Sequence, residues 1–365
     1  MSTDVEILPL KEWTENSVNF PLVIAGPCSA ESENQMIATA QKIAQIPQVK
    51  YFRAGIWKPR TRPGDFEGVG EKGFEWLQKV KDITGLKTTI EVANPKHIEL
   101  ALKYGVDMVW IGARTVVNPF NVQEIADTLK GVDIPVMIKN PVTPDIKLWI
   151  GAIERFNRRG INKIIAIHRG FHYFEKSPYR NAPMWEIPIE LKRLIPEVPV
   201  IVDPSHICGR RELIAEISQK ALDLEMDGLM IETHTDPDNA RTDAAQQITP
   251  GSLKLLLDNL IIRERSGNVD FENKLEELRT EIDKLDVELL QILAKRMEII
   301  DAIGKYKNEN GITILQMKRW AGIITDRISI GTSLGLDEKF LKRLLNIIHK
   351  ESIKIQTDIL NKDKS

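Results

Sequence analysis

The stretch "PLVIAGPCSA" (residues 21–30) leads from an apolar run directly into a proline, a cysteine and small residues. Segments with helical spacing, such as "GFEWLQKVKDITG" (73–85), separate it from later runs of the same kind. Parallel strands, which are buried on both faces, have this continuously apolar character. Seven further runs follow within about the first 260 residues: "VKYFRAGI", "LKTTIEVA", "DMVWIGA", "IPVMIKN", "KIIAIHRG", "VPVIVDP" and "DGLMIET".

Eight strands that alternate with helices are the number found in a (β/α)₈ barrel. A doubly wound open sheet is the alternative, but such sheets usually have fewer strands. No glycine-rich dinucleotide-binding fingerprint follows the first run, which also weighs against the open sheet. We therefore predict an α/β fold in which residues 1–263 form a TIM barrel.

The pattern changes beyond residue 263. The polar stretch "RERSGNVD" (263–270) contains Gly267, and no strand-like run follows it. We predict a linker over residues 264–271 and an all-helical domain of three helices over residues 272–365.

The first helix of this second domain is predicted from about Glu272 to Lys307. At 1.5 Å per residue it would be roughly 50 Å long, which is more than a small domain can cover by itself. Its apolar residues form a heptad seam, so either the later helices or a second copy of the chain must cover them. The seam contains Leu275, Leu278, Ile282, Leu285, Leu289, Ile292, Ile299 and Ile303.

Composition excludes several classes of function. The 365 residues carry a formal net charge of −2, which provides no bulk attraction to nucleic acids or membrane surfaces. No apolar run is long enough to span a bilayer, and the first residues lack the apolar segment of a signal peptide. Two cysteines cannot form a disulfide framework and indicate a reducing compartment. We predict a soluble cytoplasmic protein with neither nucleic-acid nor membrane partners.

Chemically useful side chains lie where the predicted strands end, and barrel enzymes carry their chemistry at that end. Basic residues at four of the eight ends suit phosphorylated or carboxylated substrates. A solvated rim of salt bridges is the alternative. In "KPRTRP" (58–63), however, two prolines stiffen a loop that brings Lys58, Arg60 and Thr61 together. In chain order the strand ends carry Cys28, Arg53, Glu91, Arg114, Lys139, Arg169, His206 and Glu232.

A cysteine, a histidine and carboxylates form a mixed soft and hard set of ligands, suited to Mn²⁺, Fe²⁺, Co²⁺ or Zn²⁺. Cys28, His206 and Glu232 come from different strand ends, and Asp243 in "ARTDAAQQ" can close the site from the last loop. Taken alone, each residue has an ordinary structural explanation. Cys28 can be a small buried apolar residue, and His206 a satisfied loop residue.

The ordered motifs "GPCSAE", "KPRT", "IGAR", "IKN", "HRG", "DPSH" and "IETH…D" resemble the signatures of the type I DAHP synthases. These enzymes make 3-deoxy-D-arabino-heptulosonate 7-phosphate (DAHP) at the first committed step of the shikimate pathway. The variants "SPYRN" and "DPSHICGRR" resemble the beta subclass. The 3-deoxy-octulosonate 8-phosphate synthases remain the runner-up, since they share the barrel but have an Asn-containing motif where this chain has "KPRT".

The resemblance implies a divalent metal ion, with Mn²⁺ expected first, held by Cys28, His206, Glu232 and Asp243. Glu91 would handle the proton of the water that adds during the reaction. The two substrates would be phosphoenolpyruvate and erythrose 4-phosphate, with Lys58 near the aldehyde of the latter. Erythrose 4-phosphate would be bound by Arg60 and Thr61. Phosphoenolpyruvate would be bound by Arg53, Lys58, Arg114, Lys139 and Arg169.

Polar residues also interrupt the apolar pattern of the helical domain. Arg296 falls at a seam position, where a buried arginine is costly unless an anion meets it. Arg279 and Lys307 flank the seam, as charges in coiled coils commonly do. In the last helix, Ser352 interrupts an apolar stripe and Gln356 lies one turn further on. These groups can together line a pocket for a dicarboxylate.

The stretch "LRTEIDKLDVELLQILAKRMEIIDAIGKYK" (278–307) and the residues up to Gln356 resemble the all-helical, AroQ-type chorismate mutases. In that family two chains interlock, so the resemblance implies a homodimer or higher oligomer in which Arg279 reaches into the partner's site. Lys307 and Gln356 would stabilise charge on the ether oxygen of chorismate as it becomes prephenate. Some members have acidic residues where this chain has Gln316 and Trp320. The implied binding residues are Arg279, Arg296, Lys307, Gln316, Arg319, Ser352 and Gln356.

Together these patterns predict a bifunctional enzyme, a metal-dependent DAHP synthase followed by a chorismate mutase. In the alternative, the helical domain is a non-catalytic sensor of prephenate or chorismate and a dimerisation module. We expect prephenate to inhibit the synthase through this domain in either case.

Overall fold

The computed structural model describes residues 5–14, 21–60, 62, 64–264, 266–314 and 317–362, without the side chains of 317–321 and 362. The chain divides into two compact units, residues 1–263 and 264–365. None of the helices within the described ranges is long and apolar enough to cross a membrane.

Eight parallel strands form the first unit, each paired with the next, and β8 pairs with β1 to close the barrel. The predicted barrel is therefore confirmed. The strands are β1 (Leu22–Gly26), β2 (Val49–Arg53), β3 (Lys87–Val92), β4 (Met108–Ile111), β5 (Val136–Lys139), β6 (Ile164–His168), β7 (Val200–Val202) and β8 (Gly228–Glu232).

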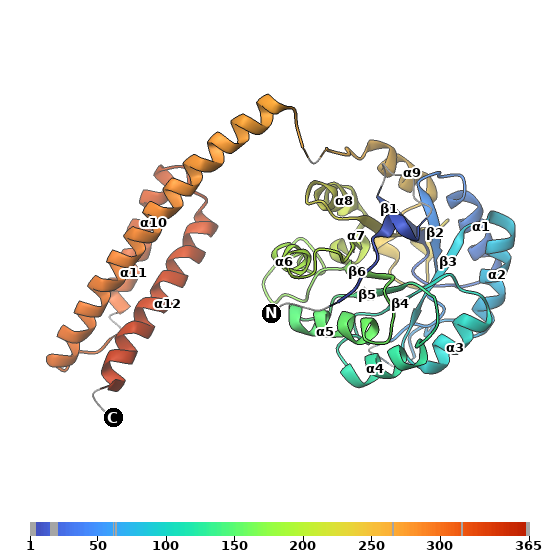
Figure 1. Cartoon of the computed structure of the whole chain (residues 1–365), viewed down its shortest axis with the longest axis horizontal. Helices are drawn as coiled ribbons and strands as arrows, with labels where there is room; N and C mark the ends of the chain where they lie inside the picture. Colours follow the sequence, from blue (N-terminus) through green and yellow to red (C-terminus); the bar gives the residue numbers. More distant parts are fainter. Residues whose placement is uncertain are drawn as a thin grey trace. The chain divides into compact units, whose positions relative to one another are not determined.

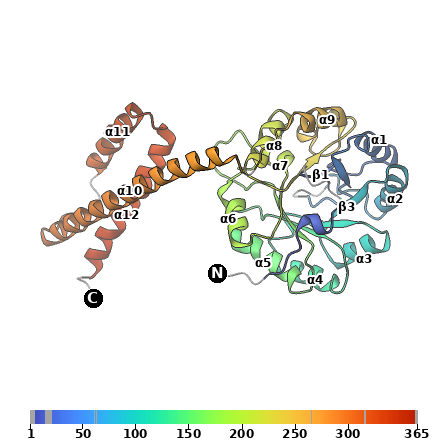
Figure 2. The same cartoon turned by 45° about the horizontal axis from the view of Figure 1, so that its top comes forward.

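Helices surround the strands of the barrel in both views (Figures 1 and 2). Several begin with an Asn, Asp or Thr cap followed by proline, a combination that starts a helix abruptly after a strand. The helices are α1 (Glu33–Ile43), α2 (Lys72–Thr84), α3 (Pro95–Lys103), α4 (Pro119–Thr128), α5 (Ile146–Asn157), α6 (Glu186–Leu194), α7 (Pro204–Cys208), α8 (Ile214–Asp223) and α9 (Pro250–Asn259). Short 3₁₀ helices are η1 (Leu10–Glu12), η2 (Arg211–Leu213), η3 (Pro237–Asn239) and η4 (Ala244–Gln246).

Alternate strand residues point into the barrel and form a closed apolar cluster there. Two residues further along the same alternation, at the carboxyl ends of four strands, the inward side chains are charged. The step leads from Tyr51 to Arg53, from Met137 to Lys139, from Ile201 to Asp203 and from Met230 to Glu232. The cluster consists of Leu22, Ile24, Tyr51, Met108, Trp110, Met137, Ile165, Ile167, Ile201 and Met230.

Within its described residues, the second unit contains three helices: α10 (Val269–Glu309), α11 (Met317–Ser333) and α12 (Glu338–Lys362). Helix α12 packs along α10, and α11 packs against α12. Helix α10 begins at Val269, earlier than the predicted Glu272. Its first turn is capped by Asn268, whose side chain accepts a hydrogen bond from the backbone N–H of Phe271 at 2.9 Å.

The 41 residues of α10 span about 60 Å. The helix extends well beyond α11 and α12 at its N-terminal end (Figures 1 and 2). Seam residues there remain open to solvent, since Ile282 is 57% exposed and Leu285 is 61% exposed. Within a single chain the seam is therefore only partly covered.

Candidate active sites

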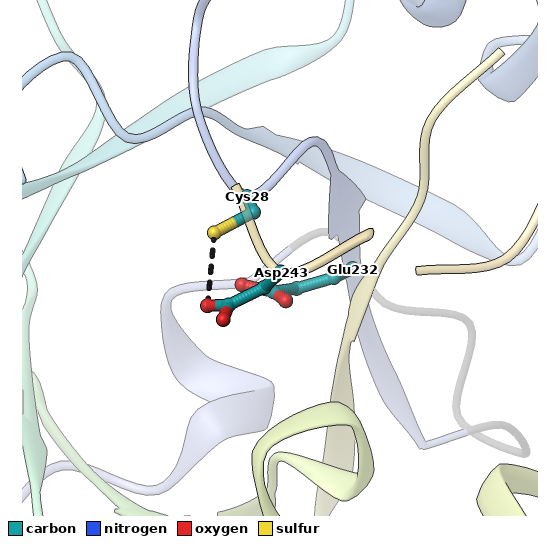
Figure 3. Close-up of side chains that lie close together, drawn as sticks. All are labelled: Cys28, Glu232 and Asp243. Atoms are coloured by element: carbon teal, nitrogen blue, oxygen red, sulfur yellow. Dashed lines mark hydrogen bonds between the residues drawn. The ribbon is translucent and has the colours of Figure 1, made fainter. Parts of the chain in front are cut away.

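Three of the four predicted metal ligands meet at the carboxyl end of the barrel (Figure 3). Cys28 lies in the loop after β1, Glu232 ends β8, and Asp243 lies in the loop that follows. One donor atom from each lies within 4.8 Å of the other two, and Cys28 Sγ lies 3.4 Å from Asp243 Oδ2. Closure of the barrel makes this possible, because Gly26 of β1 pairs directly with Glu232.

His206, the fourth predicted ligand, lies in α7, directly after β7. Its Nε2 lies 3.8 Å from Glu232 Oε1, and its Nδ1 lies 2.8 Å from Asp203 Oδ2. A carboxylate on the second ring nitrogen is the usual way in which a ligating histidine is oriented. A thiol, an imidazole and two carboxylates therefore face one region, and this donor set fits a divalent transition metal.

The thiol of Cys28 is buried in this region. Burial, together with the negative charge of Glu232, raises the pKa of the thiol to about 12, although Lys58 opposes the shift. Lys58 Nζ lies 3.0 Å from Cys28 Sγ. Because a metal binds the thiolate, a bound cation would displace the thiol proton.

Asp203 holds two of the predicted phosphoenolpyruvate ligands. Its Oδ2 lies 2.9 Å from Lys139 Nζ and 3.9 Å from Arg53 Nη1, and Arg53 Nη2 donates to Glu232 Oε1 at 3.0 Å. Burial alone would raise the pKa of Asp203, but His206, Lys139 and Arg53 hold it well below its usual range. The cationic side chains of Arg53 and Lys139 are thus held in fixed positions, because each is paired with a buried carboxylate.

Arg169 follows β6, and burial lowers its pKa to about 10, with nearby Arg180 and Arg114 acting in the same direction. Such a cluster of cations suits an anionic substrate. Arg114 Nη1 donates to the carbonyl of Pro59 at 2.7 Å, which ties the end of β4 to the "KPRT" loop. In that loop, Arg60 Nε donates to the carbonyl of Phe66 at 2.8 Å, and Thr61 lies outside the described residues.

Glu91 lies at the end of β3. Its Oε2 accepts a hydrogen bond from Trp110 Nε1 at 3.1 Å. A Cβ atom added at Gly112 would collide with Glu91 Oε1, so any other residue at that position would force this carboxylate to shift.

A cavity of about 770 Å³ lies within the helical unit. It contains four of the predicted chorismate ligands: Arg296, Lys307, Ser352 and Gln356. Arg296 Nη1 donates to Ser352 Oγ at 2.8 Å, and Lys307 Nζ donates to the carbonyl of Ile314 at 2.6 Å. Gln356 Oε1 is buried and has no hydrogen-bond partner among the described residues. Buried acceptors are usually satisfied, so this orphaned oxygen is consistent with a ligand that donates to it.

Of the other predicted residues of the helical unit, Arg279 is not brought into this cavity. Arg279 lies on the exposed N-terminal part of α10, where its Nη1 is 3.8 Å from Glu276 Oε2. Gln316 lies outside the described residues, and Arg319 and Trp320 lie in α11 without described side chains.

Two residues of the sites were not predicted from the sequence. Asp203 had two detectable signals, because it continues the inward alternation from Ile201 and precedes a helix-starting proline. Arg327 of α11 lines the helical cavity together with Ile323. It lies seven residues after Trp320, and this spacing puts both residues on one face of α11.

A parallel (β/α)₈ barrel that gathers a thiol, an imidazole, carboxylates and buried cations at its carboxyl end has the architecture of a barrel enzyme. Residues 17–264 match the model of the DAHP synthetase I family, and residues 278–357 match that of chorismate mutase type II. The chain therefore belongs to the DAHP synthetase I family and carries a chorismate mutase type II domain after its barrel.

Individual relatives match the barrel, and two different aldolase names occur among them. A phospho-2-dehydro-3-deoxyheptonate aldolase of Thermotoga maritima is 33% identical over 226 residues, which cover 62% of this chain and 64% of that one. A 2-dehydro-3-deoxyphosphooctonate aldolase of Wolinella succinogenes is 26% identical over 264 residues, which cover 66% of this chain and 98% of that one. The crystal structure of a Thermotoga maritima DAHP synthase has a TM-score of 0.60 at 27% identity, covering 70% of this chain and 75% of that one. The family matches support both predicted enzyme activities.

Proposed function

We propose that the barrel (residues 1–263) condenses phosphoenolpyruvate with erythrose 4-phosphate and water to give DAHP and phosphate. We further propose that the helical domain (residues 272–365), after the linker 264–271, rearranges chorismate to prephenate. The observation that carries the first proposal is the cluster of Cys28, Glu232 and Asp243 beside the buried cations of the strand ends. The two buried free thiols are consistent with a reducing, cytoplasmic environment.

Cys28, His206, Glu232 and Asp243 would hold a divalent metal, with Mn²⁺ expected first and Fe²⁺, Co²⁺ or Zn²⁺ also suited to the donor set. When bound, the ion would act as a Lewis acid toward the aldehyde oxygen. Lys58, whose Nζ lies beside Cys28 Sγ, would place a positive charge next to the same oxygen as it becomes negative.

The strand-end cations would orient the substrates and offset their charge. Arg60 and Thr61 would bind the phosphate of erythrose 4-phosphate. The enol carbon then attacks the aldehyde carbon, water adds to the resulting cation, and phosphate leaves. Glu91, held by Trp110, would take the proton of the added water. The cationic residues that bind phosphoenolpyruvate would be Arg53, Lys58, Arg114, Lys139 and Arg169.

Replacing Gly112 by alanine tests the role of Glu91. The added methyl group would displace the Glu91 carboxylate, and we expect DAHP formation to fall by about 100-fold, as for the loss of a general base. Gly151→Ala is the matched control, since an added Cβ there meets nothing within 4 Å. It lies in α5, so the control should be as stable as the wild type or slightly more so. Full activity of Gly112→Ala would remove Glu91 from the mechanism.

In the helical cavity, Arg296 and Lys307 would bind the carboxylates of chorismate, and Lys307 and Gln356 would stabilise charge on the breaking ether bond. The reaction is pericyclic and needs no acid, base or nucleophile. Arg319, Ser352 and Gln316 would complete the site. The partner chain would supply Arg279, and the open seam of α10 supports such a homodimer or a higher homo-oligomer.

Both activities can be tested on one preparation of the full-length protein. Chelation of divalent metals should lower DAHP formation by at least about 100-fold, and Mn²⁺ should restore it. Prephenate formation from chorismate should not change, because charge complementarity alone drives it. The runner-up activity would use a five-carbon aldose phosphate in place of the four-carbon one, and we expect that substrate to react more slowly. DAHP formation by protein shown to be metal-free would contradict the proposal.

Prephenate is expected to inhibit DAHP formation by binding in the helical cavity. Removing the positive charge of Arg296 by substitution with alanine in the full-length chain should abolish this inhibition and leave the uninhibited rate unchanged. Removing residues 264–365 should have the same effect. If a folded barrel without these residues is still inhibited by prephenate, the regulatory site lies elsewhere. Inhibition together with no chorismate turnover would favour the sensor alternative.

A further inference from the structure

The segment of Arg180 and Asn181, in the loop between β6 and α6, is fixed against α7. The backbone N–H of Arg180 donates to the carbonyl of Cys208 at 3.3 Å, and that of Asn181 to the carbonyl of Ile207 at 3.1 Å. Gly209 has a left-handed backbone (φ 68°), and a Cβ there would collide with the side chain of Arg180. The two side chains therefore project from a well-defined backbone.

Arg180 contacts two candidate metal ligands, one directly and one through an amide. Its Nη1 donates to Asp243 Oδ1 at 3.0 Å and to Gln246 Oε1 at 2.7 Å. Gln246 Nε2 in turn donates to Glu232 Oε2 at 2.7 Å. Asp243 has a left-handed backbone (φ 49°), which is uncommon outside glycine and needs support from its surroundings.

Asn181 is buried and connects the predicted phosphoenolpyruvate site to the third ligand. Its Oδ1 accepts a hydrogen bond from Arg169 Nη1 at 2.8 Å, and its Nδ2 donates to the carbonyl of His206 at 2.6 Å. This dipeptide thus contacts Arg169, a predicted substrate-binding residue. Directly or through one further residue, it also contacts three of the four candidate metal ligands.

We propose that Arg180 and Asn181 are positioning residues, with Arg180 orienting the carboxylates of the metal site and Asn181 orienting Arg169 toward phosphoenolpyruvate. The proposal rests on the proposed function of the barrel. Outer contacts of this kind typically change metal affinity by about 10–100-fold when they are lost.

The test is to titrate Mn²⁺ into metal-stripped full-length protein and to follow the signal of free Mn²⁺ by electron paramagnetic resonance. Arg180→Ala should weaken Mn²⁺ binding by about 10–100-fold, and Arg180→Lys should recover part of the loss. Asn181→Ala should chiefly raise the KM for phosphoenolpyruvate, by about tenfold, because Arg169 loses its acceptor. Arg193→Ala is the matched control, because Arg193 forms an exposed ion pair with Glu190 on α6, and it should change neither quantity.

Unchanged Mn²⁺ affinity in Arg180→Ala would overturn the role of Arg180, and an unchanged KM in Asn181→Ala would overturn that of Asn181. Thermal unfolding of each variant reports folding of the barrel, and chorismate turnover reports the concentration of intact chain. Arg180→Lys serves as the test if the alanine variant does not fold. Wild-type protein that binds no Mn²⁺ would instead count against the proposed function itself.

Discussion

Replacing Cys28 by alanine is expected to abolish DAHP formation and to leave chorismate turnover at the wild-type rate. Cys28 Sγ is the one soft donor in the cluster with Glu232 and Asp243, and its loss would both weaken metal binding and remove a neighbour of Lys58. Loss of electrostatic stabilisation of this kind costs roughly 100–1000-fold in rate. Both rates can be measured on the same protein, so the mutase reports the concentration of intact chain.

The chain offers a matched control for this prediction in its only other cysteine. Cys208 is also buried, and burial raises the pKa of its thiol to about 12. Cys208→Ala should retain DAHP formation. Loading with Co²⁺ gives a second readout, since a thiolate–cobalt absorption band should appear in wild type and in Cys208→Ala and be absent from Cys28→Ala. A band of wild-type intensity in Cys28→Ala would show that this thiol is not a ligand.

Much of the barrel and its rim follows from local sequence patterns. Strands buried on both faces are continuously apolar, so their number and order were predictable. Because side chains alternate between the two faces of a strand, Lys139 points to the same side as Met137 and Glu232 to the same side as Met230. Both charged side chains therefore lie inside the carboxyl end of the barrel.

What the sequence did not reveal depends on contacts between distant segments. Asp203 matters because β2 and β5 bring Arg53 and Lys139 to it, and nothing local to "VDPSH" indicates those neighbours. Arg180 and Asn181 belong to the motif "SPYRN", but the motif does not indicate that each contacts groups more than ten residues away in the chain. Such contacts form when the folded barrel brings distant segments together, and the spacing of apolar residues in the sequence does not indicate them.

The helical domain shows a different limit. Heptad periodicity predicted α10, but its start was predicted late because the cap at Asn268 was not recognised. The position of Arg279 raises a further difficulty, because the side chain lies outside the cavity that holds Arg296 and Lys307. The proposed role of Arg279 therefore requires a second chain, and a single sequence carries no direct mark of such symmetry.

This arrangement leads to the prediction that two inactive variants restore each other. Mixing full-length Arg279→Ala with Arg296→Ala should recover chorismate turnover to about a quarter of the wild-type rate. Each variant alone lacks one cation of the clamp and should lose roughly 100–1000-fold in rate. In a mixed two-fold dimer, one site has both arginines and the other has neither. Random exchange of chains makes about half of the dimers mixed, and each then has one intact site.

The control is a mixture of Arg296→Ala with Lys307→Ala. Both residues line the cavity of one chain, so every site in every dimer retains a defect and turnover should stay at the level of the single variants. Exchange of chains is checked independently by native mass spectrometry with one variant isotopically labelled. If the first mixture exchanges and yet recovers nothing, Arg279 does not act across the dimer. DAHP formation should be equal in all the mixtures, because the barrel site contains none of these residues, and it therefore normalises the comparison.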